Sequence, residues 1–237
     1  MHKRAKNCSA SGATFATILV GADEKPFVVH EALLTHHSDF FRAALTGRFK
    51  EAEDKTVKLP EESADMVEFF VHWLYTKRFP SKAQHDSQEL IDMWMGKNDD
   101  GESTVGSQLI GLYVFGNRFQ LQELCRKSLD TLFNRLRKNS NSSLPDPGTV
   151  SLVFARLPHS SPLCRFLVDA YCNIGDDSYY AADNEDEYPD SFLLAILRRY
   201  ARDSPSCNGY IYLDLCDYHG HKDNEERGAC KAKREKK

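Results

Sequence analysis

The chemistry-bearing residues that stand closest together are two cysteines and two histidines near the C-terminus. Cys216, His219, His221 and Cys230 offer two thiolates and two imidazoles, a ligand set that structural zinc sites use. Their spacing matches no standard zinc finger, and His219 and His221 would have to bend together across Gly220. We therefore expect a solvated tail with no metal and no other cofactor, and zinc binding by these four residues is the alternative.

Signatures of enzymes are incomplete in this chain. Residues 101–107 have the glycine spacing of a phosphate-binding loop, but they lack the lysine that contacts phosphate, and no strand precedes them. The sequence contains no Gly-x-Ser-x-Gly elbow and no His-Glu-x-x-His metal helix. Because no nucleophile, base and oxyanion site come together, we expect a protein that is not an enzyme.

Size and charge narrow the class further. The 237 residues are 41% hydrophobic, which is enough for the core of one domain with an extension. A net charge of −4 argues against a dedicated nucleic-acid binder, which usually carries a strongly basic face. The basic start has no apolar stretch behind it, and no apolar run approaches the roughly 18 residues that span a bilayer. We expect an intracellular protein, cytoplasmic or nuclear, with no membrane partner and with its seven scattered cysteines mostly as buried thiols.

Hydrophobic periodicity sets the order of the elements. Two short β-branched segments around an acidic, glycine-containing loop predict a hairpin. Apolar stripes at helical spacing then predict two helices from His30 and Ser38, a third from Ser63, and an antiparallel pair joined around Gly116. The remaining predicted segments are the strands at 15–20, 26–29 and 56–59, and the C-terminal helices at 150–157, 163–171 and 192–200.

Composition divides the chain into five parts. The polar residues 1–13 predict a disordered arm. A compact domain then covers residues 14–137, interrupted at 81–106 by a segment rich in Ser, Asp, Gly and Gln that we interpret as an exposed insertion. The other parts are a linker at 138–148, a helical region at 149–218 and a charged tail, expected to be disordered, at 219–237.

A small mixed sheet flanked by helices is an α+β arrangement, and in this order its residues resemble a BTB/POZ domain. The resemblance implies a protein-interaction adaptor, and the overall style is similar to BTB proteins of fungi. The segments that carry it are residues 16–21, 27–34, 38–41, 57–60, 69–76 and 112–124.

The resemblance also implies one interaction site. In BTB adaptors of cullin ubiquitin ligases, an apolar residue, any residue and a glutamate help to engage the cullin after the second helix. Phe49-Lys50-Glu51 stands at the matching place, after Gly47, and an exposed aromatic residue is a plausible interface anchor. The alternative is that Phe49 packs back onto the core and Glu51 is merely solvated.

We interpret several aromatic residues and one histidine as structural. We expect Phe40, Phe41, Phe70, Trp73 and Tyr75 to pack in the core, and His30 to be a satisfied buried histidine rather than a base.

The family often dimerises by exchanging an N-terminal strand and helix. The polar arm before Phe15 offers no such element, so self-association in that mode is in doubt. A second functional hypothesis is a nuclear transcription-associated regulator that reaches DNA or chromatin through its basic tail.

Overall fold

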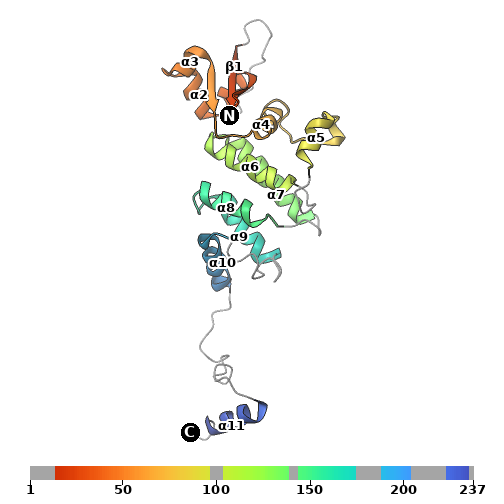
Figure 1. Ribbon diagram of the computed structural model, residues 1–237, viewed down its shortest axis with the longest axis vertical. Coiled ribbons are helices and arrows are strands. Elements are labelled where there is room, and N and C mark those ends of the chain that lie inside the picture. The colour runs from red at the N-terminus through yellow and green to blue at the C-terminus, as the bar shows by residue number, and fades with distance from the viewer. Residues whose placement is uncertain (1–13, 97–103, 139–143, 175–187, 204–222, 235–237) are drawn as a thin grey trace, which may run out of the picture. The chain divides into compact units, whose positions relative to one another are not determined.

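The computed structural model describes residues 14–96, 104–138, 144–174, 188–203 and 223–234. The chain divides into two compact units, residues 1–196 and 197–237. Among the described residues, no helix has both the length and the apolar character that crossing a membrane requires. The elements, labelled in Figure 1 where there is room, are β1 (Phe15–Val20), β2 (Lys25–His30), α1 (Glu31–His37), α2 (Asp39–Thr46), α3 (Lys50–Asp54), β3 (Thr56–Leu59), α4 (Ala64–Thr76), η1 (Lys82–Gln84), α5 (Gln88–Trp94), α6 (Val105–Arg118), α7 (Gln122–Lys138), α8 (Pro147–Arg156), α9 (Pro162–Ile174), α10 (Asp190–Asp203) and α11 (Asn224–Arg234).

The first unit is built on a three-stranded mixed sheet. β1 is the central strand, antiparallel to β2 and parallel to β3. Side chains alternate along a strand, and Ala16, Ile18 and Val20 are the buried set of β1. The hairpin turns at Gly21, whose φ of +72° suits a residue without a Cβ atom. The predicted hairpin, and the α+β class with helices around a small mixed sheet, are confirmed.

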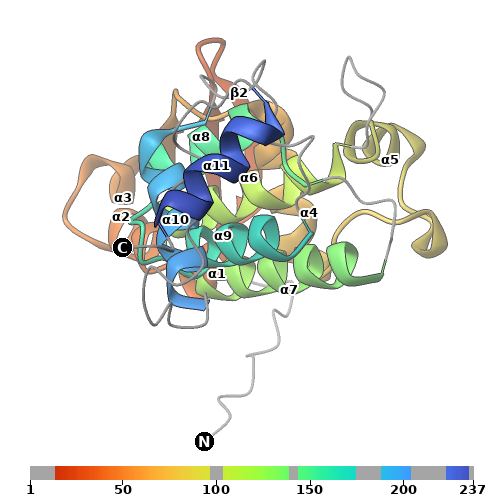
Figure 2. The same ribbon diagram turned by 90° about the horizontal axis from the view of Figure 1, so that it is seen from below.

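A helical pair packs beside the sheet-bearing part. α6 and α7 run side by side in both views (Figures 1 and 2) and form the predicted antiparallel pair. Their close approach requires Gly116, because a Cβ atom there would lie 2.8 Å from Cys125 Sγ. Burial of the Cys125 thiol in this contact raises its pKa to about 12, so at neutral pH it is a protonated packing group, as expected from the scattered cysteines.

Ser38 joins the sheet-bearing part of the first unit to the helical pair of α6 and α7. Its side-chain oxygen accepts a hydrogen bond from Phe41 N (3.0 Å), which caps α2, and donates one to the carbonyl of Phe119 (2.6 Å) just after α6. The residue is fully buried. One hydroxyl therefore satisfies a helix N-terminus and a carbonyl 81 positions away.

The interpretation of residues 81–106 as an exposed insertion is wrong for its helix. In α5, Ile91 and Trp94 are buried, and Trp94 is only 4% exposed. The Trp94 ring lies 4.9 Å from that of Phe69 and stacks 5.4 Å from that of Phe79. Seven residues are too few for a periodic pattern to separate a packed helix from a loop. Residues 97–103 lie outside the described residues.

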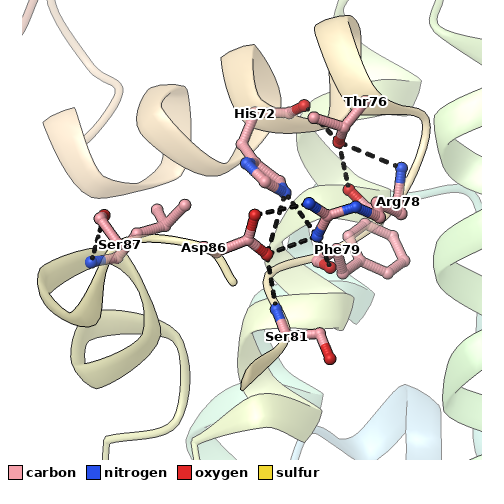
Figure 3. Close-up of polar contacts among 8 residues, drawn as sticks. His72, Thr76, Arg78, Phe79, Ser81, Asp86 and Ser87 are labelled. Carbon is pink, nitrogen blue, oxygen red and sulfur yellow. Dashed lines mark hydrogen bonds and ion pairs between the residues drawn. The ribbon is translucent and has the colours of Figure 1, made fainter. Parts of the chain in front are cut away.

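Charged hydrogen bonds fix the connection that leads to α5 (Figure 3). The Asp86 carboxylate accepts two bonds from the Arg78 guanidinium, one of 2.5 Å from Nη2, and a third of 2.9 Å from Ser81 N. His72 Nε2 lies 3.8 Å from the same carboxylate. The bonds from Arg78 hold the pKa of Asp86 well below its usual range. Asp86 is therefore a structural anion at neutral pH.

Helices α8, α9 and the start of α10 share one hydrophobic core with the sheet-bearing part. A single cluster of buried apolar residues extends from the sheet through α6 and α9 to Phe192 in α10. The linker expected at 138–148 is shorter than predicted, because α7 continues to Lys138 and α8 begins at Pro147. Leu144 is buried, and Tyr171 Oη donates to the carbonyl of Pro145. Residues 139–143 lie outside the described residues.

The tail is helical where the sequence predicted disorder. α11 occupies residues 224–234 of the second unit, and Asp223 Oδ1 accepts a bond from Glu226 N (2.8 Å) at its start. Glu225 and Glu226 stand in the first turn and basic residues follow, an order that suits the helix dipole. These local signals at the helix ends outweigh the low hydrophobicity on which the prediction of disorder was based.

A histidine joins three helix ends in the first unit. His37, the last residue of α1, lies with Nε2 2.6 Å from Lys77 Nζ and with Nδ1 3.1 Å from Glu123 Oε2. Its side chain is largely buried and meets the ring of Trp73 edge-on. Burial, helped by the charge of Lys77, lowers the pKa of His37 to about 4, although Glu123 opposes the shift.

We predict that replacing Ser38 with alanine lowers the free energy of unfolding by about 2–4 kcal/mol. The change removes a helix cap, worth about 1 kcal/mol, and leaves the Phe119 carbonyl without its buried donor, which costs about a further 1–3 kcal/mol. Urea denaturation monitored by circular dichroism measures the loss. Ser63→Ala is the matched control, because Ser63 caps α4 in the same way at an exposed position. Equal losses in the two variants would contradict a role for the Phe119 bond.

We also predict that His37 makes the first unit less stable as the pH falls. The folded-state pKa of about 4 lies below the ordinary 6.5, so the unfolded chain binds the proton first. This contribution is complete above pH 6.5 and is lost as the pH falls toward 4. From pH 7 to 5 the loss is about 1–2 kcal/mol, after allowance for partial solvent screening.

The test compares the wild type with His37→Gln in urea titrations at both pH values. The glutamine variant lacks this titration, whereas the carboxylates and the other histidines titrate in both proteins. The difference between the two proteins in how the free energy of unfolding changes with pH therefore isolates the contribution of His37. Parallel pH dependences in the two proteins would exclude the assigned pKa shift.

Candidate protein-interaction surface

The residues after α2 turn an aromatic side chain outward. α2 ends at Gly47, where a Cβ atom would lie 2.4 Å from the carbonyl oxygen of Ala43. A side chain at this position would push the chain away from the helix end. Two residues later Phe49 occupies the N-cap position of α3 and is 65% exposed. The alternative in which Phe49 packs back onto the core is therefore wrong.

Phe49 borders an open pocket of about 460 Å³. Two of the three residues singled out in the sequence line it, Phe49 and Glu51, whereas Lys50 does not. The Lys50 side chain is 85% exposed and lies 3.9 Å from Asp54 Oδ2. We call the pocket and its border the Phe49 surface; its residues come from α2, α3 and β3 and are Phe40, Ala43, Ala44, Phe49, Glu51, Val57 and Lys58.

The floor of the Phe49 surface is held by aromatic packing. The Phe40 ring lies 5.1 Å from the ring of Phe119 and 5.3 Å from that of Phe41, both edge to face. Phe41 and Phe119 are buried, so Phe40 has a fixed support. At the rim, Lys58 donates to Glu24 (2.5 Å), which leaves Glu51 as the rim charge without an ion pair among the described residues. The arrangement suits a partner that brings an apolar side chain beside a basic group.

A half-buried ion pair that sequence reasoning missed anchors the α3 segment. Lys55, which follows α3, donates to Glu31 Oε1 and to the carbonyl of Leu45, each at 2.8 Å. The second bond satisfies a carbonyl in the last turn of α2. Lys55 adopts φ of 51°, which is unusual for a residue other than glycine. No local pattern reveals this pair, because Glu31 and Lys55 are 24 positions apart.

The expected core aromatics divide into two groups. Phe41, Phe70 and Trp73 are buried, as predicted, and Phe40 packs half-buried against the core. The expectation is wrong for Tyr75, which is 47% exposed. Tyr75 follows the helical stripe but lies near the C-terminal end of α4, and its hydroxyl accepts from His30 N at 3.1 Å. Its oxygen is also 2.7 Å from His30 Nδ1, so the histidine is satisfied as expected, but it is half-buried rather than buried.

The possible zinc ligands of the tail are not brought together by any described feature. Cys216, His219 and His221 lie outside the described residues, and the side chain of Cys230 in α11 does as well. In the part of the chain that the structure describes, no three His, Cys, Asp or Glu residues are placed to hold a metal ion. The expectation of a tail without zinc stays a prediction.

Comparison with known proteins identifies the sheet-bearing part. Residues 7–94 match the family model of the BTB/POZ domain, and no curated protein matches the chain. The matched segment contains β1 to β3 and α1 to α5, and therefore the whole Phe49 surface. The predicted boundary at residue 137 and the similarity to fungal proteins stay predictions. The chain carries a BTB/POZ domain, a module through which proteins associate.

Proposed function

We propose that this protein is an interaction adaptor that holds a partner on the Phe49 surface. The observation that carries the proposal is the exposed ring of Phe49 beside an apolar pocket in the BTB/POZ domain. Large aromatic residues that border well-formed pockets are the usual anchors of protein interfaces. The fixed support of Phe40 lowers the cost of binding, because little of the surface has to be ordered when the partner arrives.

In the narrower form of the proposal, the partner is a cullin and the protein is a substrate adaptor of a ubiquitin ligase. Phe49 and Glu51 supply the apolar residue and the glutamate that BTB adaptors of this class use. The continuous core that joins the sheet to α8 and α9 supports a second part of the role. Helices packed in this way can hold a substrate-binding region in a fixed position. Such a role belongs in the cytoplasm or the nucleus.

We predict that the double variant Phe49→Ala/Glu51→Lys binds the N-terminal region of a cullin at least about 10-fold more weakly than the wild type, because anchor residues dominate interface energies. Pull-down of the full chain, followed by titration calorimetry, measures the loss. Both side chains are exposed or lie at the border of an open pocket, so we expect the unfolding midpoint to change little.

The matched control is Phe133→Ala/Glu89→Lys, which makes the same two changes at exposed positions in α7 and α5. This control should bind as the wild type does. Equal binding by all three proteins would exclude the Phe49 surface as the interface. Failure of the wild type itself to bind would exclude the cullin but leave a different partner protein for the same surface.

A further inference from the structure

The meeting point of α1, α4 and α7 contains a chain of polar groups that the adaptor role does not use. A carboxylate, an imidazole and an amine follow one another: Glu123 Oε2 lies 3.1 Å from His37 Nδ1, and His37 Nε2 lies 2.6 Å from Lys77 Nζ. Glu123 is in the first turn of α7, and Lys77 is the residue that ends α4. In the described part of the chain, Lys77 is the lysine whose amine is bonded to an imidazole nitrogen.

The order of these groups defines the proton positions. The carboxylate oxygen of Glu123 accepts the hydrogen bond, so Nδ1 of His37 carries the proton and donates it. Nε2 is then an acceptor, directed at the Lys77 amine. In the same way, a carboxylate that orients a histidine prepares it as a base for a neighbouring nucleophile. His36 lies against the ring of His37 and is a further titratable group beside it among the described residues.

The Lys77 amine is neutral more often than the amine of a solvent-exposed lysine. Burial lowers the pKa of Lys77, and Glu123 opposes the shift. The face of the Trp73 ring, 4.1 Å from Nζ, attracts the ammonium form but also covers one side of the amine. The side chain nevertheless keeps 37% of its surface exposed, so a reagent can reach it.

We propose that Lys77 is a nucleophilic lysine that accepts an acyl group from an acyl thioester, with His37 as the base and Glu123 as the residue that positions it. The site uses none of the residues of the Phe49 surface and does not rest on the proposed adaptor function.

The reaction needs no co-reactant beyond the thioester. The Lys77 ammonium first loses a proton to water, and the neutral amine, hydrogen-bonded to His37 Nε2, attacks the carbonyl carbon and forms a carbon–nitrogen bond. His37 Nε2 takes the second proton from the nitrogen of this adduct, which is far more acidic than a free lysine ammonium. The carbon–sulfur bond breaks, and its electron pair leaves with the sulfur. The thiolate takes the proton from the His37 imidazolium to become a thiol, and no atom changes oxidation state.

Acylation would change the contacts at this junction. An amide carries no charge, so it loses both the attraction to Glu123 and the contact of the cation with Trp73. The other described lysines that form ion pairs pair with carboxylates and with no imidazole: Lys50, Lys55 and Lys58. Lys77 also has a carboxylate, Glu123 Oε2, 3.9 Å from its amine, so the imidazole of His37 is the feature that distinguishes it from Lys50.

The full chain, incubated with acetyl-coenzyme A near neutral pH, tests the proposal. Peptide mass spectrometry over time gives the initial rate of acetylation at each lysine, and Lys50 serves as the reference in the same molecule. Because the Lys50 side chain is 85% exposed and that of Lys77 only 37%, access alone predicts slower reaction at Lys77. We expect Lys77 to react about tenfold faster or more, the lower range for a positioned base, and its rate to level off at a lower pH.

Two variants test the assigned roles. His37→Gln should reduce the ratio of the Lys77 rate to the Lys50 rate by about tenfold, and Glu123→Gln should reduce it by a smaller factor, with the Lys50 rate unchanged in both. Circular dichroism shows whether each variant is folded. If a variant is not folded, the ratio of the Lys77 rate to the Lys50 rate in the wild type alone decides whether the proposal holds. Reaction at Lys77 no faster than at Lys50, or a ratio that His37→Gln leaves unchanged, would overturn the proposal.

Discussion

The two hydrogen bonds of the buried Ser38 hydroxyl are the contact on which the rest of the first unit depends. They tie the N-terminus of α2 to the carbonyl that follows α6, and water cannot replace either bond at a fully buried position. The ring of Phe119, whose carbonyl accepts one of the bonds, packs against Phe40. The floor of the Phe49 surface is therefore fixed by the same junction that joins the sheet-bearing part to the helical pair.

A second constraint positions the outer edge of that surface. Lys55 adopts a left-handed backbone that costs free energy for a residue with a Cβ atom. Its amine gains bonds to Glu31 and to the carbonyl of Leu45, and these bonds offset the cost. A glycine would adopt the backbone angle more easily, but it would leave Glu31 buried without its cation. Charge pairing, rather than backbone freedom, therefore explains the lysine at this turn.

The sequence predicted what local patterns determine. The short β-branched apolar segments predicted the strands, and apolar residues at helical spacing predicted the helical pair and α9. These patterns are reliable because each of these elements turns its apolar side chains toward the core. Contacts between distant segments were missed: the pair of Glu31 and Lys55, and the packing of Trp94 on Phe69. Phe49 was found through a resemblance, and its exposure depends on Gly47 and the end of α2. Lys50 was included only because it lies between Phe49 and Glu51.

The Phe49 surface and the Lys77 junction are close along the chain, since His37 and Ser38 are consecutive. A change at Lys77 reaches His37 directly through their hydrogen bond, and one peptide bond further it meets Ser38. There it encounters a residue held on two sides in a fully buried position, in an interior that is packed too densely to yield continuously. A small displacement of the end of α1 therefore has to break or strain the two hydrogen bonds of Ser38 before it reaches α2. Because α2 carries Phe40 and leads to Phe49, we expect the two sites to act independently unless the bonds of Ser38 are lost.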